Sequence, residues 1–552
     1  MPPHRRLLVA AATNWLAFAT TLLVSFFLAP YLIRRLGDAR YGVWCVVESV
    51  LAYFTLFDLG LAACLVRFVA RFQATGERDE LNKVVSSCLA VFAVAAAAVL
   101  LLGGLLVPVV APGLEDKLAA SGGPGGPGSP AHPGSPAGPE SSGDLGSPGA
   151  PGGVTAFMLL MLANLAVTLP LSVFPTLLDG LQRFAVKSLV RIGFLAAKVV
   201  GTVYALETAP GLWSLAVVFT VVNLLEHAVM GRLAFHYLPG LRLSHRLVDR
   251  QTLRRVRGYS VDAFLAMLAG RITVQTGAVV VGGFLPVAAA AHYAIAARLV
   301  EMAKSLFRSV TTTLTPAVSE REAGGDHDGV RGVYLSATRW VLYLVLPVQL
   351  GLLAFGRPFL HRWVGRPEYA DWCYPAMAIL SATLALGTAQ SVASRVLYGL
   401  GRLRLFARLA LLEAGLNLGL SLALVGPGGV PGVAVAVAVP NVLFCLFVIV
   451  YTGRLLEVPL GRYLVAGWLR PLVAAGVPAA VWSFVTPAEP TWPGLVTAIA
   501  TGLLPYALAV TAVELVPRLL GAAVGGGRVT NRPGRLIPPR WHRRRSPAPD
   551  RA

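Results

Sequence analysis

The sequence has little charge for its length. Only 13% of its 552 residues are Asp, Glu, Lys or Arg, about half the share expected of a soluble domain. Hydrophobic residues make up 56% of the chain, and the mean hydropathy is +0.67. The apolar residues recur in segments of about 20, not in alternating stretches of about ten, which predicts membrane helices and excludes an outer-membrane-type barrel.

Cysteine is also scarce, and the motifs of enzymes are missing. The five cysteines are scattered, and no pair has the spacing of a disulfide framework or a metal site. No GxxxxGK[ST] motif occurs, and no convincing GxGxxG follows a strand. A membrane glycosyltransferase or polymerase would need catalytic carboxylates and usually a sizeable external domain, whereas the external loops offer few acids. We therefore expect no enzyme, no cofactor and no metal.

The pattern predicts an all-α integral membrane protein with about fourteen transmembrane helices. The first apolar run, from Leu7, is too long for a signal-peptide core and is interpreted as a retained helix. The spans are placed at about 7–33, 41–66, 84–110, 154–180, 188–207, 212–236, 259–282, 287–316, 338–356, 374–398, 406–425, 432–453, 471–486 and 494–517.

The positive charges predict the orientation of these spans. Of the 47 Lys and Arg residues, 35 fall on the side of the termini, seven on the other side and five within spans. Cytoplasmic loops carry such an excess, so both termini are predicted to be cytoplasmic. The net charge of +20 is thus a consequence of topology and of attraction to anionic lipid, and no nucleic-acid partner is expected.

Two biased segments and a weak internal repeat divide the chain. Residues 177–193 resemble residues 396–412, with Gly180 opposite Gly399. A looser match pairs the regions after spans one and seven, which predicts two parallel six-helix repeats followed by two further helices. The predicted domains are an N-lobe at 1–236 with a disordered Gly/Pro/Ser loop at 112–153, a basic linker at 237–258, a C-lobe at 259–453, spans thirteen and fourteen at 454–517, and a disordered basic tail at 518–552.

One apolar segment, residues 288–316, carries Arg298, Glu301, Lys304 and Arg308. At 100° per residue these four side chains occupy an arc of roughly 120° on one helix. A Lys or Arg in the middle of a lipid-facing helix costs about 2.5 to 3.5 kcal/mol on insertion scales. This arc is therefore predicted to face a polar cavity between the two repeats.

Several stretches, in order, resemble the polysaccharide flippases of the multidrug/oligosaccharidyl-lipid/polysaccharide exporter superfamily. They cover the chain except for the Gly/Pro/Ser loop and the tail, and no single one is highly specific. The stretches are Asn14, Leu36-Gly37 and Tyr41-Gly42, FDLGLAACLVRFVA at 57–70, GLQRF at 180–184, YAIAARLVEM at 293–302 with Pro316, and FLHRWVGRPEYADW at 359–372.

The resemblance implies a transporter of the bacterial cytoplasmic membrane. It would flip an undecaprenyl-pyrophosphate-linked oligosaccharide to the outer leaflet by alternating access, for cell-surface polysaccharides such as exopolysaccharide or lipopolysaccharide. The implied partners are that lipid, membrane lipids and the polymerase and assembly proteins of the pathway, and a monomer is expected. The alternatives are a lipid II flippase for peptidoglycan and a cation-coupled multidrug exporter, which the cationic cavity disfavours.

Five cations inside spans are the predicted ligands of the pyrophosphate: Arg271, Arg298, Lys304, Arg308 and Lys198. The alternatives are that Glu301 neutralises one of the first four, that Arg308 reaches the interface, and that Lys198 pairs with a neighbouring acid.

Three acids are candidates for coupling to protons or sodium: Glu48, Asp58 and Asp262. Helix packing near Gly60 is the favoured role of Asp58. Three amides could contact sugar hydroxyls, although hydrogen bonds between neighbouring helices are their favoured role: Asn14, Gln275 and Asn417. Glu226 and Glu413 could each be the partner of a cavity arginine, and His227 is expected to form a structural hydrogen bond.

Overall fold

The computed structural model describes residues 3–58, 61–75, 77–121, 153–402, 404–485 and 491–524, and these residues form helices and short connections without a β-strand. Large apolar side chains point outward from the bundle, among them Phe27, Val109, Tyr204 and Leu508, each more than two-thirds exposed. In water such a surface would be unfavourable, so it is the surface that lipid covers. The predicted multi-pass α-helical membrane protein is confirmed.

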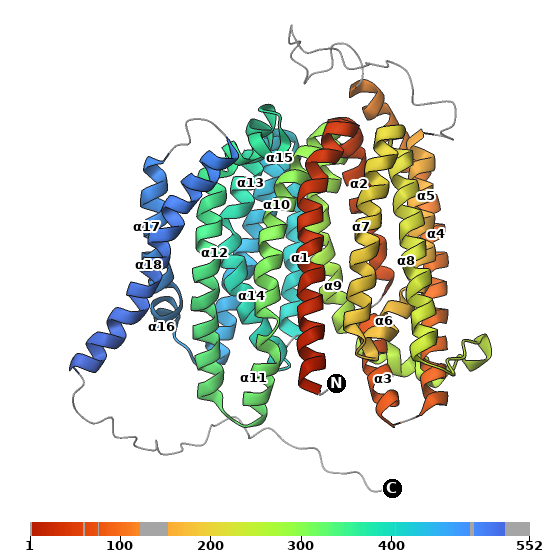
Figure 1. Cartoon of the computed structure of the whole chain (residues 1–552), viewed down its shortest axis with the longest axis horizontal. Coiled ribbons are helices and arrows are strands. Elements are labelled where there is room, and N and C mark those ends of the chain that lie inside the picture. The colour runs from red at the N-terminus through yellow and green to blue at the C-terminus, as the bar shows by residue number, and fades with distance from the viewer. Residues whose placement is uncertain are drawn as a thin grey trace.

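The chain folds in two halves that lie side by side (Figure 1). The N-half contains α1 (Pro3–Leu36), α2 (Asp38–Phe54), η1 (Thr55–Asp58), α3 (Leu61–Thr75), α4 (Arg78–Ser121), α5 (Gly153–Leu171), α6 (Val173–Gly180), α7 (Phe184–Thr208) and α8 (Leu212–Tyr237). The C-half contains α9 (Arg250–Phe284), α10 (Val287–Thr311), α11 (Leu314–Ala323), α12 (His327–Val364), α13 (Glu368–Ala382), α14 (Leu384–Gly399) and α15 (Arg404–Leu455). A short turn, η2 (His245–Leu247), lies in the connection between them.

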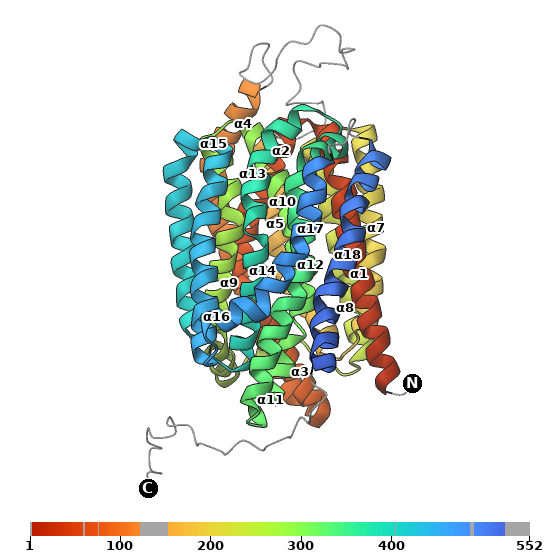
Figure 2. The same cartoon turned by 90° about the vertical axis from the view of Figure 1, so that its left-hand side faces the viewer.

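The last helices, α16 (Leu460–Tyr463), the π-helix η3 (Leu464–Leu469), α17 (Arg470–Phe484) and α18 (Trp492–Val524), pack on the outside of the C-half against α12 (Figures 1 and 2). Helix α1 begins and α18 ends on one face of the bundle, called here the N-terminal face. The other end is called the opposite face.

Among the described residues, eleven helices are long and apolar enough to cross a membrane. Three features account for the difference from the predicted fourteen. Helix α15 is a hairpin, because Gly429 breaks it with φ of 55° and the Asn441 amide donates to Glu413 across the two arms. The second predicted span is split between α2 and α3, and α10 carries too much charge for a hydropathy criterion.

Three predicted segment boundaries were wrong. Helix α4 continues to Ser121, so residues 112–121 are helical, because Leu114 is buried and Glu115 accepts hydrogen bonds from the backbone and hydroxyl of Thr155 at the start of α5. Helix α9 begins at Arg250 inside the predicted linker, and α18 continues to Val524 inside the predicted tail. The rest of the loop, residues 122–152, and of the tail, residues 525–552, lies outside the described residues.

The same turn occurs in both halves, at the residues that the sequence repeat aligns. A Cβ on Gly180 would lie 2.6 Å from the Val69 side chain and 3.3 Å from the Val66 carbonyl. A Cβ on Gly399 would lie 2.6 Å from the Val318 side chain and 3.2 Å from the Thr315 carbonyl. The amides of Arg183 and Arg402 then donate to Leu178 and Leu397, five residues back in each case.

The packing at these turns predicts that a side chain at either glycine destabilises the protein. In Gly399→Ala and Gly180→Ala, the new methyl group overlaps a valine, and overpacking of this kind costs about 1–3 kcal/mol. We expect the Tm of the detergent-solubilised protein to fall by several degrees, and Val318→Ala to restore part of the loss in Gly399→Ala. Gly415→Ala is the control, since nothing lies within 4 Å of its Cβ. Equal Tm values for Gly399→Ala and Gly415→Ala would contradict the packing described.

Candidate functional site

Helix α10 supplies three of the predicted ligands, and two of them have acidic neighbours within the C-half. Arg308 forms an ion pair of 2.8 Å with Glu301, seven residues earlier on the same face. The Lys304 ammonium interacts electrostatically with Glu413 of α15, whose carboxylate is buried and accepts a hydrogen bond of 2.8 Å from Asn441. The charges of Arg308 and Lys304 are thus partly balanced within the C-half.

Arg298 reaches across to the N-half. Its Nη1 donates to the hydroxyl of Tyr41 on α2 over 3.3 Å. Helices α2 and α10 run in the same direction, and they touch where a Cβ on Gly42 would lie 2.0 Å from the Val287 carbonyl oxygen. The side chain of Arg298 therefore lies at the seam, the contact between the two halves. It is nearer to the N-terminal face than the contact of Gly42 with Val287.

Helical spacing places Arg271 on the same side of α9 as Gly282. It precedes Gly282 by eleven residues, which is three helical turns, and Gly282 packs against the Val46 side chain of α2. Between Arg271 and Gly282 on α9, the Thr276 hydroxyl forms a hydrogen bond of 3.0 Å with the Tyr53 hydroxyl of α2. In the described part of the chain, no acid forms an ion pair with Arg271.

Lys198 on α7 is the cation of the N-half. Its ammonium donates to the Asn223 amide oxygen over 2.9 Å and lies 4.6 Å from the centre of the Phe219 ring. Glu226 and Glu48 both interact with it electrostatically. Lys198 therefore has acidic neighbours, but it forms no ion pair with an acid among the described residues, and its pairing with an acid stays an alternative.

The structure describes only some of the remaining candidate residues. The side chains of Asp58 and Asp262 lie outside the described residues. Asn417 of α15 donates to the Thr273 carbonyl of α9 and so joins the two helices. His227 contacts the Asn223 carbonyl one turn earlier in its own helix. Glu48 is exposed although Val47 and Ser49 on either side of it are buried. Its carboxylate therefore lies outside the packed core.

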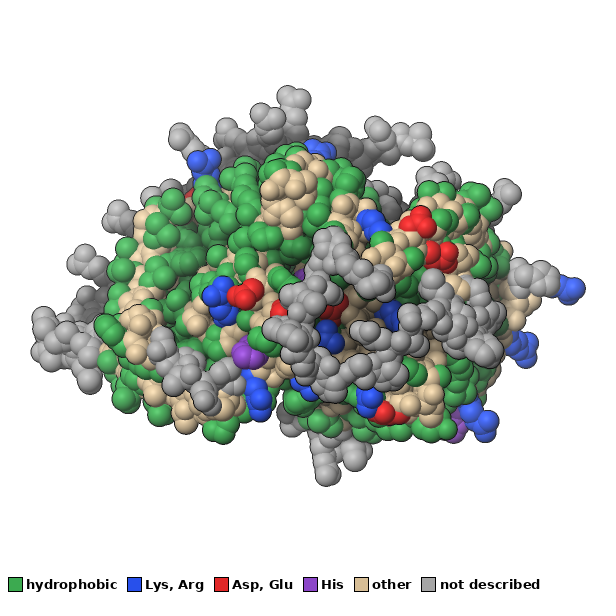
Figure 3. All heavy atoms as spheres, turned by 90° about the horizontal axis from the view of Figure 1, so that it is seen from above, with side chains coloured by type: hydrophobic (Ala, Val, Ile, Leu, Met, Phe, Trp, Pro, Cys, Tyr) green, Lys and Arg blue, Asp and Glu red, His purple; other side chains and the backbone are tan. Residues whose placement is uncertain are grey.

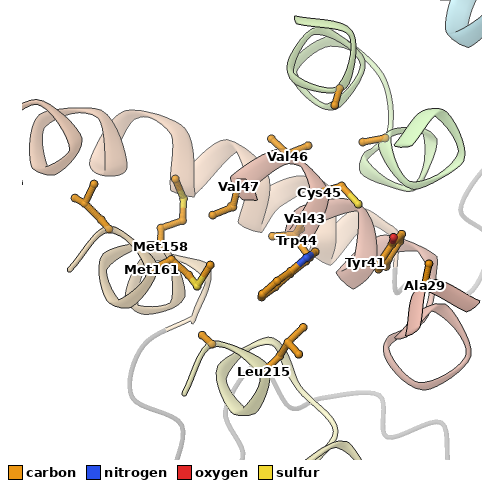
Figure 4. Close-up of a cluster of buried hydrophobic side chains, with 14 of the residues drawn as sticks. Ala29, Tyr41, Val43, Trp44, Cys45, Val46, Val47, Met158, Met161 and Leu215 are labelled. Carbon is orange, nitrogen blue, oxygen red and sulfur yellow. The ribbon is translucent and has the colours of Figure 1, made fainter. Parts of the chain in front are cut away.

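Figure 4 shows how α2 divides its side chains between the two halves. Trp44 points toward the helix of Leu215, and its ring centre lies 4.8 Å from that of Phe219. Val46 points away from it, toward the helices drawn in green. Helix α2 therefore makes most of the contacts between the N-half and α9 and α10, the two helices that carry Arg271 and Arg298.

The sequence did not predict that the halves are joined at the opposite face by polar contacts. Asp38, at the start of α2, forms an ion pair of 2.9 Å with Arg366 and accepts a hydrogen bond of 2.5 Å from the Tyr369 hydroxyl. His292 of α10 lies 4.0 Å from the same carboxylate. Burial alone would raise the pKa of Asp38, but these neighbours outweigh it and hold the pKa below its usual value. Asp38 is therefore ionised at neutral pH.

Two further cations complete this opposite-face seal, which consists of Arg34, Asp38, Lys117 and their partners. The Lys117 ammonium of α4 donates to the carbonyls of Gly282, Gly283 and Leu285 at the end of α9, over 2.5 to 3.1 Å. The Arg34 Nε of α1 donates to the Val364 carbonyl at the end of α12 over 2.8 Å. Cations at the C-termini of helices are favourable because free carbonyls and the helix dipole meet there.

Figure 3 shows the opposite face, where charged side chains lie among apolar ones. A cavity of about 140 Å³ lies elsewhere, between the end of α3, the start of α4 and the residues after α8. Arg78, Asn82 and Tyr237 are among its lining residues, and none of the predicted site residues lines it.

The comparisons agree with this architecture. A family model described as "Polysaccharide biosynthesis protein" matches residues 158–367. The lipid II flippase MurJ, in an inward closed conformation, superposes with a TM-score of 0.67 at 14% identity, over 92% of this chain and 100% of that chain. The chain has the fold of the multidrug/oligosaccharidyl-lipid/polysaccharide exporter (MOP) superfamily. The resemblance to its polysaccharide flippases, predicted from the sequence, is confirmed.

A curated relative matches a short segment of the chain. The membrane protein EpsK of Bacillus subtilis (strain 168) is 28% identical over 79 residues, which are 14% of this chain and 16% of that protein. The chain thus matches less than a fifth of the length of this relative.

Two MATE transporters also superpose on the chain. The TM-score is 0.61 to an inward-facing MATE transporter, at 13% identity over 79% of this chain and 94% of that chain. To an outward-facing one the score is 0.51, at 13% identity over 81% and 95%. Both likenesses show that this chain shares the fold of these transporters.

Proposed function

We propose that this protein flips a polyprenyl-diphosphate-linked oligosaccharide from the cytoplasmic to the outer leaflet of a bacterial cytoplasmic membrane. In this proposal both termini are cytoplasmic and the two halves alternate in opening around the seam. The observation that carries the proposal is the position of Arg271 and Arg298. Arg298 contacts α2 through Tyr41, and Arg271 shares one side of α9 with Gly282, which packs on α2, so both support a path for an anionic headgroup along α2.

The chemistry of the headgroup fits these groups. A diphosphate needs charge-assisted donors, and a guanidinium can bind phosphate through two parallel hydrogen bonds. Arg271 is without an ion-pair partner among the described residues, and Arg298 donates to a neutral hydroxyl. The polyprenyl tail can remain in lipid, so the protein has to shield only the charged and sugar portions during the crossing.

Lipid II is the second candidate, because it carries the same diphosphate and because MurJ, named as a lipid II flippase, superposes over most of the chain. The match to the polysaccharide biosynthesis family model favours the first candidate. A cationic drug is the least favoured, since Arg271 and Arg298 would repel it.

Transport into proteoliposomes distinguishes these candidates. Purified protein would be assayed with three fluorescent substrates in separate vesicles: a polyprenyl-diphospho-oligosaccharide, lipid II and a cationic dye. We expect transport of the first, measured as fluorescence that becomes accessible to a membrane-impermeant quencher, at least tenfold faster than in protein-free vesicles. Preference for lipid II would move the protein to peptidoglycan synthesis, and transport of the dye alone would refute the flippase proposal.

A further inference from the structure

Glu48 lies on the face of α2 that Arg298 approaches. Tyr41, Cys45 and Glu48 are spaced four and three residues apart and so share one side of the helix. Arg298 binds the Tyr41 hydroxyl at the upper end of this row. Glu48 and Arg298 interact electrostatically without a direct ion pair.

Lys198 lies on the other flank of Glu48. Trp44 is one turn before Glu48 and packs on Phe219, and the ammonium of Lys198 lies over that same ring. Glu48 therefore stands between a cation of the N-half and a cation of the C-half. The charged groups around it are Arg298 from α10, Lys198 from α7 and, beyond Lys198, Glu226 from α8, with Tyr41 and Cys45 on its own helix.

Resting on the function proposed above, we propose that Glu48 is the counter-ion of Arg298 in the empty transporter and that the substrate diphosphate displaces it. Both anions need the same guanidinium. Once the phosphates occupy Arg298, two new negative charges stand beside a carboxylate that has lost its partner, and this disfavours its ionised form. Glu48 then takes up one proton from water, so each substrate molecule binds together with one proton.

This coupling makes a quantitative prediction, because a ligand that binds together with one proton binds about tenfold more tightly for each pH unit lowered. The probe is a short-chain prenyl-diphospho-N-acetylglucosamine, a diphosphate diester whose own charge is constant in this range. We expect its affinity for the purified wild-type protein to rise about tenfold per unit between about pH 8 and pH 6. Glu48→Gln should bind at least about tenfold more tightly than wild type near pH 7.5, with affinity independent of pH.

Glu226→Gln is the matched control, because it removes an acid near Lys198 that does not face Arg298. It should keep the pH slope of the wild type. Direct proton uptake by the wild-type protein on addition of the probe, measured with an indicator dye in weak buffer, tests the same coupling without any variant. A slope of zero in the wild type, or a slope retained in Glu48→Gln, would overturn the inference while leaving the flippase function standing. Absence of binding at every pH would instead refute the proposed function, and the inference with it.

Discussion

Arg298→Gln and Arg271→Gln should each slow transport of the lipid-diphosphate substrate by about 10- to 100-fold. Each change removes a charge-assisted hydrogen bond to the diphosphate, worth about 1.5–3 kcal/mol, and 1.4 kcal/mol corresponds to a factor of ten. The double variant should be inactive. The measurement is the initial rate of flipping in proteoliposomes, normalised to the amount of folded protein.

Arg308→Gln is the control for this experiment. It lies on the same helix as Arg298, but its charge is already balanced by Glu301 at 2.8 Å. We expect less than a threefold change. If Arg308→Gln were as damaging as Arg298→Gln, the substrate would contact the end of α10 instead of the seam at α2, and the site proposed here would be wrong.

Gly42→Ala should open the opposite face. The added Cβ would lie 2.0 Å from the Val287 carbonyl oxygen, a backbone atom that cannot rotate away, so α2 and α10 must separate. Overpacking costs about 1–3 kcal/mol, which shifts the ratio of closed to open forms by about 5- to 150-fold. Electron paramagnetic resonance distances between spin labels at Ala120 on α4 and Phe284 on α9 would report the change.

The control for this prediction is Gly113→Ala, the same change on α4 with nothing within 4 Å of the new Cβ. It should leave the distance distribution unchanged. An unchanged distribution in Gly42→Ala as well would mean that the contact between α2 and α10 does not hold the seal closed.

The sequence predicted the helical membrane fold and aligned the turns at Gly180 and Gly399, because hydropathy and short repeats are local signals. The polar contacts of the opposite-face seal were not predicted. Asp38, Arg366 and Lys117 were read only as loop charges, since nothing in their spacing shows which distant residue each one meets. The one signal available was that Asp38 is the only acid in the first external loop.

The candidate site was predicted in part for the same reason. The charged arc on α10 is a local pattern, and the spacing of Glu301 and Arg308 was compatible with the ion pair that the structure contains. That Arg298 meets Tyr41, 257 residues away, depends on the packing of α2 against α10, which helical periodicity does not encode. Helix α4 exceeded its predicted end because the capping of α5 by Glu115 is likewise a contact between distant segments.

The paired turns of the two halves have the same backbone hydrogen bonds but different side-chain interactions. At the positions where the first half has the ion pair of Asp179 and Lys187, the second half has the aromatic pair of Tyr398 and Phe406. Ion pairs weaken as salt screens them, whereas contacts between aromatic rings respond mainly to temperature. The two turns therefore differ in their response to solution conditions. Higher ionic strength would weaken the turn of the first half and leave that of the second half unchanged.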